Sequence, residues 1–428
     1  MPPSIPLDIW SALRAGPNSK EYGPSGPCTF AVRTSCRACG STDLQQYLDL
    51  GIQAPANALR ERVGSPPEFT APLSIAWCSA CGLSQLEQVV DPKVLYADYP
   101  FRAGVSKLWQ SHCSVLMASL HPEGRKFLID IGSNDGALLR EATDRGWKVL
   151  GVDPTPIGDL PSLEALWSSG IARRIARFHG QADVVTATNV FGHVDDAEDF
   201  LEGISIILKP RGLAIIECPH IFPLLEQVAF DTIYHEHLSY WSLRPLELLA
   251  EQVGLKVIDV KMFSDLHGGT MRYVLTPGDQ KTHVKTSVTG LRVLESAHFQ
   301  QGLKPYRDFG ETARSHVNRM RETLIAEDEA GARIWGYGAN AKSAVLLQAL
   351  NLPEGTVERI VDDTAAKHFK ATPGTHIPIY GHENILSEPD ILILFSWNNA
   401  ADLKAKARER HFHGRFFLPH PEPHFEET

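Results

Sequence analysis

The 428-residue sequence contains no run of 18 apolar residues, so no membrane-spanning helix is predicted. It also lacks an excess of positive charge. The net charge of −10 and the pI near 6.0 argue against a nucleic acid or an anionic membrane as a partner held by bulk charge. The first residues, MPPSIPLDIW, have no basic start followed by an apolar segment. We therefore expect no signal peptide and a cytoplasmic location.

Cysteine is scarce, and its spacing favours a metal site over disulfides. Four of the seven cysteines form two CxxC pairs, each followed by glycine: Cys36, Cys39, Cys78 and Cys81. Both thiolates of a CxxC turn can reach one ion, and two pairs complete a closed tetrahedral zinc site with no open position for catalysis. The 38 residues between the pairs exceed the usual zinc-ribbon spacing, so we expect an inserted loop. The prediction is a structural Zn²⁺ ion.

From residue 126 the pattern is strand, glycine-rich turn, helix and strand, in FLIDIGSNDGALLREATDRGWKVLGVD. The turn lacks the GxGxxG spacing of dinucleotide sites. Its D-x-G-x-x-x-G spacing, from Asp130 to Gly136, is the one used for S-adenosylmethionine. Asp153 ends the second strand, where a carboxylate suits ribose hydroxyls. The predicted cofactor-binding residues are Asp130, Gly132, Asn134, Gly136, Asp153 and Asn189.

Four proton-active side chains stand in a row in FDTIYHEHLSYWSL: Tyr234, His235, Glu236 and His237. A core does not need such a run, and most of these groups can act as acid or base near neutral pH. A polar loop whose histidines are satisfied by neighbours is the alternative. HEH is not HExxH, which argues against a catalytic metal there. His193 follows another strand and is expected over the cofactor, or else as a satisfied loop histidine.

The C-terminal part repeats the strand, glycine-rich turn and helix pattern in ARIWGYGANAKSAVLLQAL. Lys342 at the helix start is a natural anion site, suited to a phosphate. Trp397 and Asn398 end a later strand, and Arg272 could pair with an anion or a carboxylate. We expect the histidine-rich tail to be a solvated terminus; it contains His411, His413, His420 and His424.

Eight motifs in order carry a family resemblance: CRACG…WCSACGLSQL, DIGSNDGALL, GVDPT, ATNVFGHV, FDTIYHEHLSYWSL, HGGTMR, GYGANAKS and SWN. Together they resemble the S-adenosylmethionine-dependent sugar C-methyltransferases, which act on nucleotide-linked 4-keto deoxysugars. The resemblance runs from about Cys36 to Trp397. The sequence departs from it at Asn340 and Ser343, because family members tend to have GAPAKG.

The resemblance implies an α/β fold in three parts: a small N-terminal zinc-binding domain, a central Rossmann-like methyltransferase domain and a second Rossmann-like domain that contributes to nucleotide binding. The predicted division is an extension (1–27), the zinc-binding domain with an aromatic loop (28–110), the methyltransferase domain (111–300), a linker helix (301–330) and the C-terminal domain (331–428). The implied substrate is a small molecule, a nucleotide-linked ketosugar, and the expected state is a monomer or homodimer.

The family chemistry is removal of a proton beside a ketone and methylation of the resulting enolate. By resemblance, His237 is the base, and Tyr234, Glu236, His193 and Tyr99 complete the catalytic set. The substrate-binding candidates are His235, His267, Arg272, Lys342, Trp397 and Asn398. Three alternatives stay open: a different enolisable acceptor, a nicotinamide-dependent oxidoreductase using the C-terminal half, and a non-catalytic metal-stabilised binding module.

Overall fold

The computed structural model describes residues 30–62, 67–96, 104, 107–120, 126–264, 266, 268–279, 282–381 and 387–426. The predicted N-terminal extension, Tyr99 and His267 lie outside these residues, and the statements about them stay predictions. No helix in the described part of the chain is long and apolar enough to cross a membrane.

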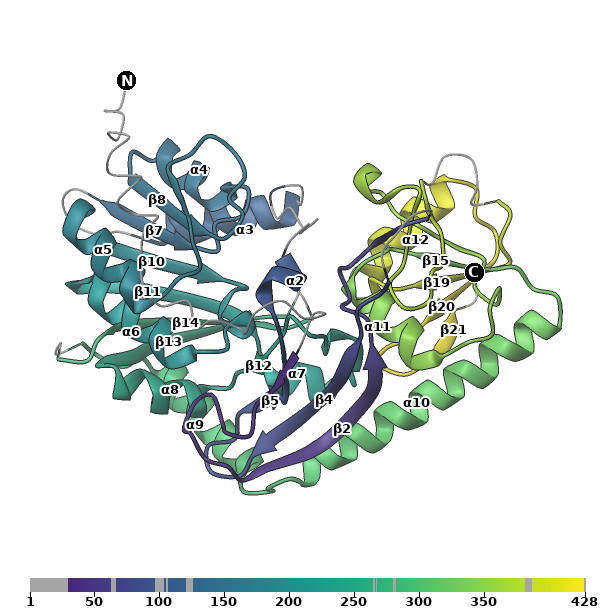
Figure 1. Cartoon of the computed structure of the whole chain (residues 1–428), viewed down its shortest axis with the longest axis horizontal. Coiled ribbons are helices and arrows are strands. Elements are labelled where there is room, and N and C mark those ends of the chain that lie inside the picture. Colours follow the sequence, from purple (N-terminus) through teal and green to yellow (C-terminus); the bar gives the residue numbers. More distant parts are fainter. Residues whose placement is uncertain are drawn as a thin grey trace.

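A seven-stranded sheet forms the lobe on the left of Figure 1, in the order β13-β14-β11-β10-β7-β8-β9. The strands are β7 (Phe127–Ile131), β8 (Lys148–Asp153), β9 (Ser162–Glu164), β10 (Ala182–Thr188), β11 (Leu208–Pro219), β13 (Leu255–Phe263) and β14 (Thr270–Pro277). The five from β11 to β9 are parallel, and β14 and β13 are antiparallel additions. Every residue of β7 is buried, as expected for a parallel strand covered on both faces.

The helices of this lobe are α3 (Lys107–Ala118), α4 (Ala137–Asp144), α5 (Ser169–His179), α6 (Ala197–Ile207), α8 (Leu243–Gln252) and α9 (Thr286–Phe299). Of these, α4, α5, α6 and α8 lie between strands of the sheet in the chain, α3 precedes the first strand and α9 follows the last. The parallel strands all end at the same edge of the sheet. This edge therefore gathers the turns after β7, β8 and β10, where ligands bind in folds of this kind. The predicted Rossmann-like architecture is confirmed.

The N-terminal sheet has the order β12-β5-β4-β2, with β2 (Leu44–Gln53), β4 (Ala71–Cys78), β5 (Ser84–Leu86) and β12 (Ser239–Tyr240). Between the cysteine pairs, β2 and β4 form a long antiparallel pair. The predicted inserted loop, expected to include residues 53–57, is thus limited to shorter segments, among them residues 54–59 between β2 and β3. In Figure 1 this pair arches from the central lobe to the C-terminal lobe. The segment that follows β2 also contacts the C-terminal part of the chain, because β3 (Arg60–Glu61) pairs with β17 (Lys370–Ala371).

The C-terminal lobe contains a six-stranded sheet in the order β18-β16-β15-β19-β20-β21, parallel except for β21. Its strands are β15 (Ile334–Tyr337), β16 (Arg359–Val361), β18 (Ile379–Tyr380), β19 (Ile391–Leu394), β20 (Arg415–Leu418) and β21 (His424–Glu426). Helices α11 (Ala341–Leu350) and α12 (Ala400–Glu409) belong to the same lobe. The second Rossmann-like half is thus present.

The lobes are joined by the long helix α10 (Lys304–Glu329), which runs along the lower side of the molecule in Figure 1. Its buried face carries Tyr306 and Phe309, whose rings pack against Tyr47 of β2 with centroids 5.3 and 6.1 Å apart. One hydrophobic cluster contains residues from β2, β4, α10 and the C-terminal sheet. The N-terminal sheet is therefore a structural bridge between the two lobes.

Candidate functional site

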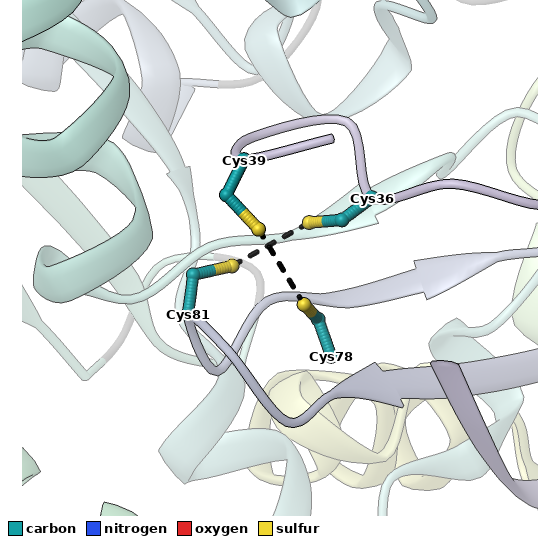
Figure 2. A group of neighbouring side chains, drawn as sticks. All are labelled: Cys36, Cys39, Cys78 and Cys81. Atoms are coloured by element: carbon teal, nitrogen blue, oxygen red, sulfur yellow. Dashed lines mark hydrogen bonds between the residues drawn. The ribbon is translucent and has the colours of Figure 1, made fainter. Parts of the chain in front are cut away.

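Four cysteine side chains converge from two turns, as Figure 2 shows. The Sγ atoms of Cys36 and Cys81 are 3.4 Å apart, those of Cys39 and Cys78 are 3.6 Å apart, and all four lie within 4.8 Å of one another. Four sulfurs bound to one Zn²⁺ at about 2.3 Å would be about 3.8 Å apart in a tetrahedron. This donor set therefore fits a closed zinc site.

The two cysteine turns have the same backbone geometry. The N–H of Gly40 donates to the carbonyl of Cys36 over 2.9 Å, and the N–H of Gly82 donates to the carbonyl of Cys78 over 2.8 Å. Both glycines have left-handed backbones, with φ of 72° and 90°. A side chain would strain this conformation, which explains the glycine after each pair.

The turn after β7 has left-handed backbone at three positions: Gly132 (φ 71°), Asn134 (φ 49°) and Gly136 (φ 75°). A Cβ on Gly132 would lie only 2.1 Å from the side chain of Val190, so the turn packs too closely for any other residue. The Asp153 carboxylate braces the turn: it accepts the N–H of Asn134 over 2.9 Å, and that of Thr155 over 2.8 Å. Asp153, which is predicted to bind the ribose, thus also stabilises the turn itself.

Three further polar residues lie in or beside this turn: Asp130, Ser133 and Asn189. Burial raises the pKa of Asp130 to about 7, although its carboxylate accepts a hydrogen bond from Thr186 over 2.7 Å. The side-chain oxygens of Asn189 and Ser133 are buried and have no hydrogen-bond partner within the described ranges. Buried polar atoms are rarely left unpaired, so these two oxygens fit a polar ligand that brings its own donors, as S-adenosylmethionine does.

The Tyr-His-Glu-His run follows a short helix, η3 (Phe230–Thr232), and leads directly into β12. Strand β12 pairs antiparallel with β5 of the N-terminal sheet, and the N–H of Leu86 donates to the carbonyl of Leu238 over 2.9 Å. The zinc-binding part of the chain therefore holds the segment that carries the predicted base. This pairing could not be predicted from the sequence, because β12 is only two residues long.

His237 lies between a tyrosine hydroxyl and a backbone carbonyl. Its Nδ1 is 3.0 Å from the carbonyl oxygen of Thr232, which can only accept, so Nδ1 carries the proton. Its Nε2 is 2.6 Å from the hydroxyl of Tyr234, which then donates to it. The fixed tautomer leaves the Nε2 lone pair as the basic position of the ring.

His193, in the short helix η2 (Phe191–His193) after β10, packs against His237. The two ring centroids are 4.9 Å apart at an interplanar angle of 71°. Burial lowers the pKa of His193 to about 4, so its imidazole is neutral at pH 7. A neutral neighbour lets His237 gain a proton without repulsion from a second positive charge.

Glu236 is 1% exposed and faces a residue of the N-terminal domain. The side-chain nitrogen of Asn57 lies 2.9 Å from each of its carboxylate oxygens. The two residues are 179 positions apart in the chain, and no local spacing marks Asn57 as part of a site. Asn57 is thus a partner of a predicted site residue, and the sequence did not reveal this contact.

His235 and Arg272 are engaged by the protein itself. The Nε2 of His235 donates to the carbonyl of Pro72 over 3.1 Å, and burial lowers the pKa of this imidazole. The guanidinium of Arg272 pairs with the buried carboxylate of Glu217 and lies 3.2 Å from Nε2 of His112. The anion expected for Arg272 is therefore a carboxylate of the chain, and substrate contacts by these two residues stay predictions.

The C-terminal candidates lie together. The Nζ of Lys342 donates to the side-chain oxygen of Asn398 over 3.0 Å and lies 4.3 Å from the ring centroid of Trp397. The indole N–H of Trp397 donates over 2.8 Å to Asp231, which lies three residues before Tyr234. This hydrogen bond connects the C-terminal lobe to the segment with the predicted base.

His420 overturns part of the expected solvated tail. His411, His413 and His424 are exposed, whereas His420 is 1% exposed and its Nε2 lies 3.4 Å from Asp231. Burial by itself raises the pKa of Asp231, but His420 and Lys342 outweigh it, and the net pKa is lowered. Strand β20 brings His420 back into the protein, which a count of histidines near the C-terminus cannot predict.

Three family models match the chain: a zinc binding domain (residues 36–96), a methyltransferase domain (105–260) and a C-methyltransferase C-terminal domain (265–421). The C-methyltransferase NovU of Streptomyces niveus is 31% identical over 405 residues, which cover 91% of this chain and 96% of NovU. The chain belongs to the C-methyltransferase family. The predicted enzyme class, with S-adenosylmethionine and zinc as cofactors, is confirmed.

This C-methyltransferase is also similar to the ubiquinone biosynthesis O-methyltransferase of Acinetobacter baumannii, at 27% identity over 194 residues, covering 39% of this chain and 78% of the relative. A solved structure, the 1,6-didemethyltoxoflavin-N1-methyltransferase of Burkholderia thailandensis, has a TM-score of 0.32 and 13% identity, covering 40% of this chain and 82% of that one. These partial likenesses add nothing to the family assignment.

Asp153 and Asp362 occupy corresponding positions in the two Rossmann-like halves of the C-methyltransferase, but their partners differ. Asp362 in the C-terminal half accepts the N–H groups of Ala339 and Thr364, each over 2.8 Å, just as Asp153 braces the first turn. Here, however, Lys367 lies 3.1 Å from the Asp362 carboxylate and 2.7 Å from the Ala339 carbonyl. In a dinucleotide site this acid would bind a ribose. In this protein Lys367 pairs with the acid in place of a ribose, which argues against the oxidoreductase alternative.

Asn340 and Ser343, where the sequence departs from the family pattern, form the N-terminal cap of α11. The Asn340 side chain accepts the N–H of Ser343, and the Ser343 hydroxyl accepts the N–H of Asn340, each over 3.0 Å. This reciprocal cap satisfies backbone donors that a phosphate could otherwise bind. Any anion at this helix start therefore depends more on Lys342 than on the backbone.

Proposed function

We propose that the enzyme methylates the carbon next to the ketone of a nucleotide-linked 4-keto deoxysugar, with His237 as the base. The observation that carries the proposal is the tautomer of His237, whose Nε2 lone pair faces Tyr234 while Nδ1–H is held by Thr232. The motif resemblance supplies the substrate class. The C-methyltransferase family supplies the reaction type.

A carbon-bound proton beside a ketone needs a positioned base and hydrogen-bond donors for the developing oxyanion. Nε2 of His237 takes this proton, and the electron pair of the C–H bond moves into the enolate. The Thr232 carbonyl, which accepts from Nδ1–H, then faces an imidazolium and stabilises its charge. General-base catalysis of this kind contributes about 10²–10⁴-fold.

The hydroxyl of Tyr234, beside the proposed base, is the first donor that we assign to the enolate oxygen. In the structure it donates to Nε2 of His237, so it must turn from Nε2 to the ketone oxygen of the acceptor before Nε2 can take the substrate proton. Neutral His193, beside His237, can donate a second hydrogen bond. When bound, S-adenosylmethionine supplies the methyl group that the enolate carbon acquires.

The remaining groups suit the rest of the acceptor. Lys342 offers a cation for the acceptor's phosphate beside the aromatic face of Trp397. Glu236, oriented by Asn57, offers a carboxylate for a sugar hydroxyl. These contacts come from three parts of the chain, and the hydrogen bond between Trp397 and Asp231 links two of them.

Mass spectrometry of incubations with S-adenosylmethionine and a panel of nucleotide-linked 4-keto-6-deoxysugars tests the acceptor class. We expect a product heavier by one methylene unit for at least one member. A matched panel of enolisable ketones without sugar or nucleotide serves as the control. Methylation in the second panel alone would reject the sugar assignment.

Proton removal can be tested apart from methyl transfer. With S-adenosylhomocysteine in place of the methyl donor, the enzyme in deuterium oxide should exchange the proton beside the acceptor's ketone. His237→Gln should lose this exchange and keep its affinity for S-adenosylmethionine. Exchange at the wild-type rate in that variant would reject His237 as the base.

A further inference from the structure

Arg37 lies between Cys36 and Cys39 in the chain, but its guanidinium contacts Asp195 and Leu86 instead of the four sulfurs. Its side chain is 0% exposed. Its Nε donates to the Asp195 carboxylate over 3.0 Å, and a terminal nitrogen donates to the carbonyl of Leu86 over 2.7 Å. A buried guanidinium is costly unless it is paired and hydrogen-bonded, so these two contacts determine where it sits.

Asp195 comes two residues after His193 and ends the turn that carries it. The next residue, Asp196, caps α6 by accepting the N–H of Asp199 over 3.1 Å. At the start of the turn, Phe191 stacks on Trp241 with centroids 4.3 Å apart. The turn from Phe191 to Asp195 is therefore held at one end by ring packing. At its other end it is held by the helix cap and by the ion pair with Arg37, beside which Arg33 also pairs with the Asp195 carboxylate over 3.0 Å.

The backbone of Leu86 connects this ion pair to the segment with His237. Its N–H donates to the carbonyl of Leu238, next to His237, and its carbonyl accepts from Arg37. One residue of β5 thus anchors both histidine-bearing segments. Small displacements of reacting groups lower kcat strongly, so loss of this anchor is expected to lower kcat.

We infer that Arg37 is a positioning residue, which holds His193 against His237 through Asp195 and Leu86. The inference rests on the proposed roles of the two histidines. It assigns Arg37 a task separate from the zinc site, although the residue stands between two predicted zinc ligands.

The test is Asp195→Asn in the full-length zinc-loaded enzyme, because this change keeps the shape and removes the charge. The matched control is Glu202→Gln, which neutralises the acid of an exposed ion pair with Arg173. Deuterium uptake by backbone amides of residues 189–196 should rise at least fivefold in Asp195→Asn and stay unchanged in the control. The kcat for a methylated nucleotide-linked ketosugar should fall about 10- to 100-fold, with zinc content and S-adenosylmethionine affinity retained.

Arg37→Lys provides a second variant, which keeps the positive charge but cannot reach both acceptors with one planar group. It should give a smaller loss of kcat than Arg37→Gln. Unchanged deuterium uptake in Asp195→Asn, or faster uptake with wild-type kcat, would overturn the inference. So would a loss of kcat that added zinc restores. If the wild-type enzyme methylates no ketosugar, the proposed function fails. Deuterium uptake in Asp195→Asn and Arg37→Gln then still decides whether Asp195 and its pair with Arg37, rather than the pair with Arg33, hold the turn.

Discussion

Truncating Asn57 tests whether the N-terminal domain takes part in acceptor binding. The Asn57 amide donates to both oxygens of the Glu236 carboxylate, each over 2.9 Å, and Glu236 is 1% exposed. A hydrogen bond to a charged group contributes about 1.5–3 kcal/mol, and Asn57→Ala removes this donor without adding another. If Glu236 holds the acceptor, a loss of about 2–3 kcal/mol lowers kcat/KM about 30- to 150-fold.

The assay is steady-state methylation of a nucleotide-linked ketosugar, combined with calorimetric titration of S-adenosylmethionine. We expect the loss in kcat/KM for the acceptor and an S-adenosylmethionine affinity within about twofold of wild type. Gln181→Ala is the control, because Gln181 is also an amide that donates two hydrogen bonds, to the carbonyls of Ile206 and Leu208, away from the site. A kcat/KM within about threefold of wild type for Asn57→Ala would refute the reasoning.

Three further outcomes follow from the site. His237→Gln should lower kcat by about 10²–10⁴-fold with S-adenosylmethionine affinity retained, and near-normal turnover in a rapid-quench assay would reject the base assignment. Cys39→Ser should release zinc to a chromogenic chelator that leaves the wild type and Cys113→Ala loaded; equal retention would place the metal elsewhere. Because burial lowers the pKa of His193 to about 4, the folded protein binds fewer protons than the unfolded chain between pH 6.5 and 4. The titration of His193 therefore leaves the free energy of unfolding unchanged above pH 6.5. Between pH 6.5 and 4 this free energy falls on acidification, by at most about 3 kcal/mol, because the folded protein keeps this imidazole neutral. Denaturant unfolding of His193→Gln should lack this component, and an identical pH dependence in both proteins would contradict the buried, neutral imidazole.

The parts of the fold that depend on short spacings could be predicted from the sequence. The strand KVLGVD has the predicted bounds, and the turn from Gly132 to Gly136 follows its strand as expected. The two CxxC turns bring four sulfurs together because each turn positions its own thiolates. In these cases the geometry is set by backbone within a few residues, and glycine at a left-handed position marks it.

Contacts between distant segments could not be predicted. Asn57 and Glu236 are 179 residues apart, and Arg37 and Asp195 are 158 apart. No local pattern states which of two neighbouring side chains will face a partner. His235 and His237 show this, since one donates to Pro72 and the other accepts from Tyr234.

The reactive groups can be named from the order of residues: four thiolates, a glycine-rich cofactor turn, a row of proton-active groups and a lysine at a helix start. Which of these groups meet depends on how the three parts of the chain pack. Strand β12 joins the N-terminal sheet, and Asp231 meets Trp397 and the buried His420. The physical reason is that burial and pairing depend on surfaces from several elements, and these surfaces form only when the three parts of the chain pack together.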